Sequence, residues 1–452
     1  MSGGLDRTRP PAPGALRPFH VPEVTHAELG GFPVRTVRLA RLPVVTAALV
    51  LPAAEAALDH EQAGLAVLTA EALEGGTRRR SGTALAEALE AVGADVSVHG
   101  GWDGTVAYLS CLADRFAEAF DLLAEMVLAP AFPDGEVERT REQSLARIRH
   151  RAMDPAALAS DRATALFYAD GEPYGRPVAG TEGSVAGLAT ADLAGFADGA
   201  YRPRGGGLVV AGDVDQGEVT DLAGSVLAGW EGGPSPRQPV RGAPRFEERT
   251  IHVVHRAGSV QSELRIGHPG VARVSPDYHA LVVANSVLGG TFTSRLNLNL
   301  REQRGFTYGV RSGFAFRGGP GPFSVRTAVD TEVTAEAVGE TVGELTRWAE
   351  AGPTVEEVEA ARDYVAGVFP LRLETTAQVA GRVAELLLYG LPDDAWTRYR
   401  DQIRSVTAEA ASAALSRHVR PDELTIVVVG DADLVQGPLE ELGLGPVQIH
   451  DR

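Results

Sequence analysis

An internal repeat is the feature that most constrains how this chain can fold. The segment RPRGGGLVVAGDVD begins at Arg202, and RPDELTIVVVGDAD begins at Arg420, an offset of 218 residues. Shorter matches keep the same order at offsets of 214 to 221: ALEGGT with SVLGGT, EVE with EVE, and Tyr168 with Tyr389. Several matches in one order indicate that the chain is two copies of one domain of about 210 residues.

The repeat divides the 452 residues into four predicted segments. Residues 1–29 are rich in Pro, Gly and Arg, lack the apolar stretch of a signal peptide, and are predicted to be a disordered arm. Residues 30–231 form the first domain and residues 247–452 the second. Residues 232–246, GGPSPRQPVRGAPRF, have no periodic apolar face and are predicted to be the linker.

Within each copy, strand-like segments come first, helices follow, and strand-like segments return. Residues 36–51, TVRLARLPVVTAALVL, are typical of a hairpin. Residues 61–73 have helical spacing, and Gly75-Gly76 is a helix C-terminal signal. Residues 95–112 return to strand spacing. This grouping predicts an α+β protein with two homologous domains, each a mostly antiparallel or mixed sheet covered by helices.

Charge argues against two classes of partner. The chain has 60 acidic and 42 basic residues, all of the latter arginine, which gives a net charge of −18. Such a surface repels phosphate backbones and anionic lipid, so we expect no nucleic-acid or membrane partner. The longest apolar run is interrupted by Pro52 and Glu55 and is too short to span a bilayer. We therefore expect a cytoplasmic protein. Cys111, the only cysteine, is predicted to be a core residue and not a nucleophile.

Residues 259–310, SVQSELRIGHPGVARVSPDYHALVVANSVLGGTFTSRLNLNLREQRGFTYGV, carry a family resemblance. Together with the repeat, they resemble the inverzincin peptidases, the pitrilysin or insulinase family, over about residues 30–440. Proteins of that family are zinc peptidases whose halves close on a peptide like a clamshell, so the resemblance implies that this chain forms half of a clamshell. Their first half carries H-x-x-E-H on a helix, with a further glutamate downstream. The two histidines share one helical face and bind zinc, and the glutamate between them is the general base.

The metal half of that site is degenerate in this sequence. In GLAVLTAEALEGGT the His, Glu and His positions fall on Val67, Ala70 and Glu71, and in TREQSLARIRH the downstream glutamate position falls on Arg147. One carboxylate beside valine and alanine cannot supply the three or four ligands that zinc needs. His252 and His255 lie on a probable strand, where residues three apart point to opposite faces, and are predicted to be structural. We therefore expect no metal and no cofactor in this chain.

The resemblance implies that the other half of the active site remains. The family's substrate-contacting arginine and tyrosine fall on Arg301 and Tyr308 in LREQRGFTYGV. An arginine can donate two hydrogen bonds to carbonyls or a carboxylate, and a tyrosine hydroxyl can donate to an oxyanion.

The strand-like DVSVHGGWDGT matches the family's substrate-pairing edge strand, with Ser97 where an asparagine is usual. This makes Ser97, Val98, His99 and Gly100 candidate substrate-binding residues through main-chain hydrogen bonds. Without zinc nearby, Ser97, His99 and Trp102 could face a partner or the wall of the chamber instead.

These observations favour a zinc-free subunit of a heterodimeric metallopeptidase. A homologous partner with H-x-x-E-H would hold the zinc, and the substrate would be a peptide, with leader peptides as one candidate class. Two alternatives remain: a purely structural subunit, like the core proteins of respiratory complexes, and a peptide-binding module that acts without catalysis. A purely structural descendant has little reason to keep both Arg301 and Tyr308.

Overall fold

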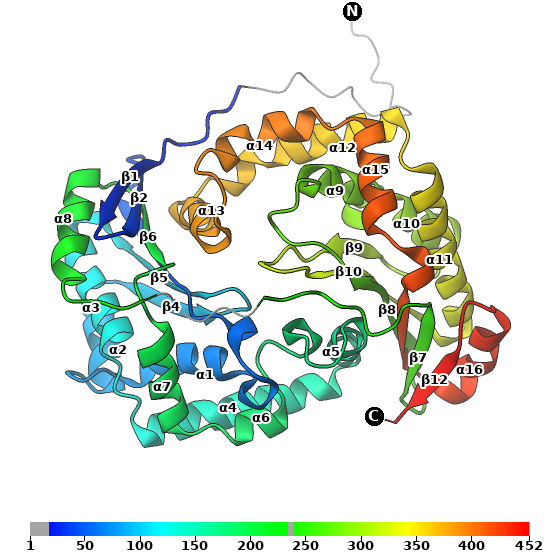
Figure 1. Cartoon of the computed structure of the whole chain (residues 1–452), viewed down its shortest axis with the longest axis horizontal. Coiled ribbons are helices and arrows are strands. Elements are labelled where there is room, and N and C mark those ends of the chain that lie inside the picture. The colour runs from blue at the N-terminus through cyan, green and yellow to red at the C-terminus, as the bar shows by residue number, and fades with distance from the viewer. Residues whose placement is uncertain (1–17, 234–238, 452) are drawn as a thin grey trace, which may run out of the picture.

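The computed structural model describes residues 18–233 and 239–451, and these form two mixed sheets of six strands each (Figure 1). The strands of the first sheet are β1 (Thr25–Leu29), β2 (Phe32–Arg38), β3 (Val44–Leu51), β4 (Asp95–Gly100), β5 (Thr105–Leu112) and β6 (Gly207–Gly212). Those of the second are β7 (Thr250–His255), β8 (Gln261–Pro269), β9 (Arg311–Phe314), β10 (Pro322–Asp330), β11 (Thr425–Gly430) and β12 (Val447–His450). Helices lie against both sheets, so the predicted α+β class with two similar domains is confirmed.

The two sheets repeat one topology. Their strand orders are β1-β2-β6-β3-β5-β4 and β12-β7-β11-β8-β10-β9. The repeated segments found in the sequence become β6 and β11, which take the same place in each sheet. Each is parallel to one neighbour and antiparallel to the other, and each is buried along its whole length. The sheets differ in their outermost strand, because β1 comes from the start of the chain and β12 from its end.

Two local predictions for the first half are wrong. Residues 36–51 do not form a hairpin, because β6 lies between β2 and β3. A fully buried strand from later in the chain takes the central place, which no short-range pattern can show. Residues 25–29 are not part of a disordered arm, because they form β1 and pair with β2 through a turn at Gly30-Gly31 with φ of 58° and 88°. Residues 1–17 of the predicted arm and 234–238 of the predicted linker lie outside the described residues.

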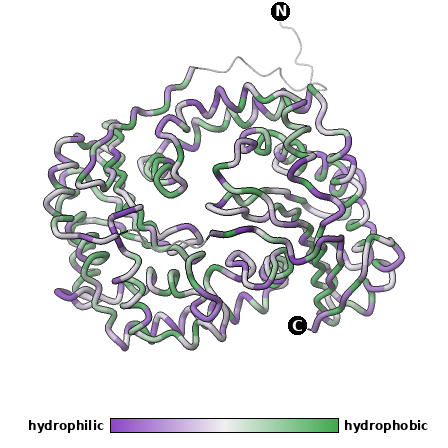
Figure 2. The backbone as a smooth tube through the Cα atoms, viewed as in Figure 1, coloured by the Kyte–Doolittle hydropathy of each residue, from purple (hydrophilic) through white to green (hydrophobic). Residues whose placement is uncertain are grey.

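Hydrophobic and hydrophilic residues alternate along the helices (Figure 2), which is typical of helices that bury one face. Those of the first half are α1 (Leu65–Ala72), α2 (Gly82–Ala91), α3 (Phe116–Leu128), α4 (Asp134–Met153), α5 (Pro155–Phe167), α6 (Glu182–Ala186), α7 (Thr190–Ala200) and α8 (Gln216–Val226). Those of the second are α9 (Tyr278–Asn285), α10 (Arg295–Asn297), α11 (Thr334–Ala351), α12 (Val355–Val368), α13 (Thr376–Tyr389), α14 (Ala395–Arg404), α15 (Ala408–His418) and α16 (Ala432–Glu441). The predicted stop after α1 is present, because the chain leaves the helix through a 3-10 turn and Gly76 at φ 127°. None of the described helices is long and apolar enough to cross a bilayer.

The two halves exchange a helix. Helix α5 of the first half packs on β8 and β11 of the second sheet, and α13 of the second half packs on β3 and β6 of the first (Figure 1). Tyr168, which directly follows α5, is fully buried and donates a hydrogen bond to the Pro320 carbonyl at 2.9 Å. Tyr389 is the last residue of α13. The repeated tyrosines therefore mark the ends of the two exchanged helices.

Polar contacts also join the halves beside the exchanged helices. The Tyr174 hydroxyl donates to Asp103 Oδ1 at 2.9 Å and accepts the Gly319 N–H at 3.1 Å. The Arg317 guanidinium lies 4.6 Å from the centre of the Tyr174 ring. Residues of both halves therefore complete this cluster, so the two halves are joined by direct contacts as well as by the chain between them.

His268 in β8 is a buried histidine whose neutral form is held by two hydrogen bonds. Its Nδ1 lies 2.8 Å from the Pro269 carbonyl oxygen, and its Nε2 accepts the Arg420 backbone N–H at 3.1 Å. An N–H donor at Nδ1 and an acceptor at Nε2 define the neutral tautomer. Burial lowers the pKa of His268 from 6.5 to about 4, against the opposing effect of the Pro269 hydrogen bond.

We expect His268 to make stability depend on pH between about 6.5 and 4. The unfolded chain takes up a proton on this ring near pH 6.5 and the folded chain only near pH 4, so the unfolded state binds more protons in that window. The contribution of His268 to the free energy of unfolding is complete above pH 6.5. It is lost as pH falls toward 4, by up to about 3 kcal/mol. Urea unfolding of wild type and His268→Gln at several pH values measures this. Equal pH slopes for the two proteins would contradict the prediction.

Candidate functional site

Arg301 and Tyr308 line one open cavity of about 720 Å³, which we call the Arg–Tyr cavity. Phe292, Arg311 and Arg326 also line it. All its lining residues belong to the second half, between residues 263 and 364. The structure therefore brings together the predicted arginine and tyrosine. It does not bring the degenerate zinc positions of the first half into the same cavity.

Tyr308 projects from a loop whose backbone is held in place. Its side chain is 98% exposed, and it makes no hydrogen bond or ring contact with any residue that the structure describes. The next residue, Gly309, is held through its N–H by Thr307 Oγ1 at 3.1 Å and through its carbonyl by Thr327 Oγ1 at 3.1 Å. The loop thus offers a phenol hydroxyl to whatever enters the cavity, at a position that its backbone defines.

Arg301 is oriented by its neighbours. Its guanidinium lies 3.4 Å from the centre of the Phe292 ring, and it forms an ion pair with Glu302. Only 13% of the Arg301 side chain is exposed, whereas Phe292 is a largely exposed aromatic residue. Stacking on an aromatic face restricts a guanidinium without using all five of its N–H donors. Arg301 therefore keeps donors available toward the cavity.

The side chain of Asn297 holds the loop that carries Tyr308 in place. Asn297 was not among the residues predicted from the sequence. The side chain is buried, donates to the carbonyls of Thr291 at 3.1 Å and Val310 at 2.8 Å, and accepts the Val310 N–H at 3.1 Å. It joins the segment before α10 to the segment after Tyr308. An asparagine inside the apolar run SRLNLNL is a signal that could have identified it, because a buried amide needs several partners.

Two π-helical turns border the same cavity. They span Ser286–Gly290, after α9, and Leu298–Gln303, after α10. Asn285 ties the first to β9, because its Nδ2 donates to the Ser312 carbonyl at 3.1 Å and its Oδ1 accepts from Ser312 Oγ at 2.7 Å. Single π-turns inside helices are frequent at functional sites. The second turn carries Arg301 itself.

The degenerate zinc positions of the first half do not fit a zinc ion. Helices α1 and α4 do bring two of them together, because Glu71 of α1 forms an ion pair with Arg147 of α4. Ala70 is buried in the core and Val67 is partly buried. The four positions supply one carboxylate, and its charge is already balanced by a guanidinium. Zinc needs three or four nitrogen, sulfur or oxygen ligands, which this set lacks.

Another group of ligand-type side chains is explained by a helix cap. His255, Asp431 and Asp433 have donor atoms within 4.8 Å of one another. Asp431 caps α16, because its carboxylate accepts the N–H groups of Asp433 at 3.2 Å and Gly258 at 2.7 Å, and His255 Nδ1 accepts the Ala432 N–H at 3.1 Å. His252 bonds to His450 and Thr250 in the same sheet. His252 and His255 both lie on β7, the strand predicted for them, and their hydrogen bonds there are structural.

The candidate substrate-pairing strand is β4, and it is the outermost strand of the first sheet, next to β5 alone. Ser97 and His99 alternate with Val98, whose side chain is buried and unavailable to a ligand. Gly100 packs on α1 so closely that a Cβ there would lie 2.5 Å from the Ala66 carbonyl oxygen. The free edge of β4 can pair with an extended peptide through main-chain groups, in the mode of strand addition.

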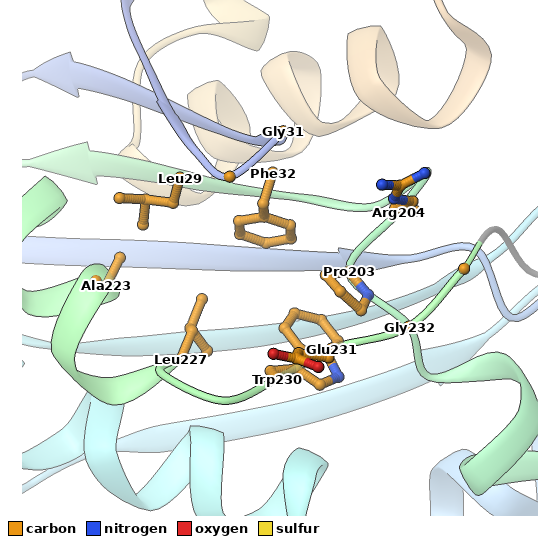
Figure 3. Close-up of a pocket in the computed structure, with 13 residues that line it drawn as sticks. Leu29, Gly31, Phe32, Pro203, Arg204, Ala223, Leu227, Trp230, Glu231 and Gly232 are labelled. Carbon is orange, nitrogen blue, oxygen red and sulfur yellow. The ribbon is translucent and has the colours of Figure 1, made fainter.

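A second hollow, of about 540 Å³, lies at the opposite edge of the first sheet (Figure 3). It is lined by the β1–β2 turn and by residues after α8. Phe32 and Trp230 meet edge to face there with ring centres 5.5 Å apart, and Trp230 Nε1 donates to the Tyr201 carbonyl at 3.1 Å. None of the candidate residues from the sequence lines this hollow.

Comparison with known proteins identifies the family. Residues 37–182 match the model of the insulinase family (peptidase family M16), and residues 188–365 match the peptidase M16 inactive domain. An uncharacterized zinc protease of Mycobacterium tuberculosis H37Rv is 31% identical over 362 residues, 78% of this chain and 81% of that protein. The chain belongs to the M16 (insulinase) peptidase family. The predicted resemblance is confirmed.

The relatives of this M16 protein include one that is named a non-peptidase homolog. A Helicobacter pylori protein named non-peptidase homolog YmxG is 23% identical over 376 residues, 82% of this chain and 86% of that protein. The crystal structure of a peptidase M16 inactive domain from Pseudomonas fluorescens matches with a TM-score of 0.84 and 28% identity, over 90% of this chain and 98% of that one. A protease from Helicobacter pylori shares the fold with a TM-score of 0.84 at 18% identity. Together with the lost ligands, these matches make the chain an inactive-type M16 member.

We expect zinc binding to return when the lost ligands are restored. Val67→His and Glu71→His place two imidazoles four residues apart on α1, and Arg147→Glu supplies a carboxylate from the helix that already contacts Glu71. The triple variant should retain about one zinc per chain after gel filtration, as measured by elemental analysis. Val67→His with Glu71→His, in which Arg147 remains, is the matched control and should retain much less. A triple variant that holds no zinc would show that α1 and α4 do not have metal-binding geometry.

We expect Asn297→Ala to destabilise the Tyr308 loop. It leaves the buried N–H and carbonyl of Val310 without their partner, which costs about 2 kcal/mol in the free energy of unfolding. Asn299→Ala is the matched control, because Asn299 lies in the same run and makes one side-chain hydrogen bond, to Glu340 at 3.0 Å. Urea unfolding should show the larger loss for Asn297→Ala. Equal losses would remove Asn297 from its proposed positioning role.

Proposed function

We propose that this M16 protein is the zinc-free subunit of a heterodimeric metallopeptidase. The observation that carries the proposal is the contrast between two places in the chain. At the zinc positions, the one carboxylate, Glu71, is already paired with Arg147. Tyr308, in contrast, is fully exposed and lines the same cavity as Arg301, which is oriented by its contact with Phe292. An exposed tyrosine in a held loop contributes little to stability, so a role toward a bound molecule accounts for it better than packing does.

The proposed chemistry divides the active site between two chains. A partner of similar size with H-x-x-E-H would hold the zinc and its water. Tyr308 would donate a hydrogen bond to the oxyanion formed when that water attacks the scissile carbonyl, and Arg301 would bind substrate carbonyls or a carboxylate through two donors. The Arg–Tyr cavity supports action in trans, because no residue of this chain's own first half lines it.

The proposed substrate is an extended, unfolded peptide, with leader peptides as one possible class. The free edge of β4 at Ser97–Gly100 supports this, since strand addition selects extended chains. Two such subunits closing as a clamshell would exclude folded proteins by size. We place this activity in the cytoplasm.

The first test is reconstitution with a partner. A chain of similar size that carries H-x-x-E-H and is encoded beside this one is co-expressed, and the purified pair is assayed on fluorescence-quenched peptides. The pair should cleave, and each chain alone should not. A stable pair in which this chain leaves the partner's activity unchanged would favour an assembly subunit, and cleavage by this chain alone would refute the zinc-free assignment.

We expect Tyr308→Phe to lower the kcat of the pair by about 10²–10³, because one oxyanion donor is lost. Assembly should be unchanged in size-exclusion chromatography, since the Tyr308 hydroxyl has no partner in the described part of the chain. Tyr364→Phe is the matched control, because Tyr364 lines the same cavity and is also exposed. Normal turnover by Tyr308→Phe would exclude the oxyanion role.

We expect Arg301→Ala to raise the KM of the pair and to lower its kcat, since substrate orientation is lost. Arg301→Lys keeps the charge without the forked donors and should recover only part of the activity. Arg304→Ala is the control, because Arg304 lies in the same segment and pairs with Glu340. Kinetics that are the same for Arg301→Ala and Arg304→Ala would contradict the assignment.

A further inference from the structure

A row of arginines crosses three neighbouring strands of the second sheet. Arg326 of β10 lies directly opposite Arg265 of β8 on one side and directly opposite Arg311 of β9 on the other. Residues directly opposite each other in antiparallel strands point to the same face of the sheet. The three side chains, which we call the arginine row, therefore lie on one face.

Only one end of the arginine row has partners. Helix α5 covers β8 on this face, and Arg265 donates to Ser160 Oγ at 3.1 Å, the Ala156 carbonyl at 2.8 Å and Glu263 Oε2 at 2.9 Å. Glu263 is thereby occupied by Arg265. Beyond α5, Arg326 and Arg311 are exposed, and neither side chain has a hydrogen bond or ion pair within residues 18–233 and 239–451.

The fold does not require this row. In the first half, the corresponding strands place Ala48, Tyr108 and Ser97 opposite one another in the same order, and none is charged. Like charges directly opposite each other in a sheet are destabilising. The second half therefore carries an unfavourable arrangement that its own repeat lacks, in a chain of net charge −18. A ligand of opposite charge would offset this cost.

Arg326 and Arg311 lie beside the proposed catalytic groups. Both line the Arg–Tyr cavity together with Arg301 and Tyr308. Arg311 follows Tyr308 by only three residues. An anion bound by the row would thus lie next to the peptide bond on which Tyr308 is proposed to act.

We propose that Arg311 and Arg326 bind a carboxylate of the peptide that enters the cavity, so that the subunit selects acidic peptides. The inference rests on the proposed function for the peptide nature of the ligand. Guanidinium groups pair with carboxylates through two parallel hydrogen bonds, and such charge-assisted bonds are about twice as strong as neutral ones. The acidic surface elsewhere opposes binding weakly, because charges beyond about 8 Å are screened at physiological ionic strength. The carboxylate belongs to an Asp or Glu side chain or to the peptide's C-terminus.

Binding to this chain alone tests the inference without a partner or catalysis. The probes are unstructured Gly/Ser/Ala peptides, labelled with an uncharged BODIPY dye, that contain two glutamates or, in the matched peptide, two glutamines. Each is made with a free and with an amidated C-terminus. Fluorescence anisotropy should show at least about tenfold tighter binding of one carboxylate-bearing form than of the neutral, amidated peptide. Loss of the preference on Glu→Gln assigns the side chain, and loss on amidation assigns the C-terminus.

The matched variants separate the row from overall charge. Arg311→Gln with Arg326→Gln should abolish the preference for the carboxylate-bearing peptide. Arg78→Gln with Arg79→Gln removes the same charge from two exposed residues outside the cavity and should leave it intact. Arg311→Lys with Arg326→Lys should retain part of it, because charge remains and the forked geometry is lost.

Two results would overturn the inference: equal binding of acidic and neutral peptides by wild type, or an undiminished preference in Arg311→Gln with Arg326→Gln. Failure of the proposed function would look different. The pair would then not cleave, while the free chain still discriminated between the peptides.

Discussion

Each sheet of this protein is partly covered by a helix from the other half of the chain, and the arrangement of the two halves depends on this exchange. A sheet buries one face only if a helix layer packs on it, and α5 and α13 provide part of that layer reciprocally. Separating the halves would expose apolar surface on both sheets, including the faces that bury Tyr168 and Val427. The position of α5 also determines which part of the second sheet is left exposed. Beyond the edge of α5, Arg326 of β10 and Arg311 of β9 remain exposed, and both line the Arg–Tyr cavity.

The first half shows how a fold survives the loss of its metal site. Helices α1 and α4 lie in contact, and an ion pair between Glu71 and Arg147 joins them. That pair is partly exposed and contributes on the order of 1 kcal/mol or less, far below the 10 kcal/mol or more of a structural zinc site. The helix is held instead by its surroundings. Glu55 is fully buried at the N-terminus of α1, where it accepts the N–H groups of Gly64 at 2.7 Å and Ala66 at 3.1 Å and pairs with Arg176.

The second half uses two side-chain amides, one buried at Asn297 and one partly buried at Asn285, to hold an exposed hydroxyl. Asn297 and Asn285 satisfy the backbone of the loops around the cavity, so that Tyr308 needs no packing of its own. The arginine row follows the same logic, because its inner member is fixed under α5 and its outer members are left free. In both cases the buried group is hydrogen-bonded, and the exposed side chains have no partner among the described residues. Fixed buried groups that support exposed polar side chains are typical of a ligand-binding surface.

The sequence by itself determined the duplication and the class of fold, because these depend on residue identity and spacing along the chain. Its resemblance to the family implied the degenerate zinc positions and the candidate pair Arg301 and Tyr308. The sequence did not determine that β6 separates β2 from β3 or that residues 25–29 form a strand. Nor did it determine that α5 and α13 each pack on the sheet of the opposite half. Those features depend on contacts between segments far apart in the chain. The same holds for Arg265, Arg326 and Arg311, which come from three separate strands. Only strand register, set by burial across the whole sheet, decided that they form one row beside the tyrosine.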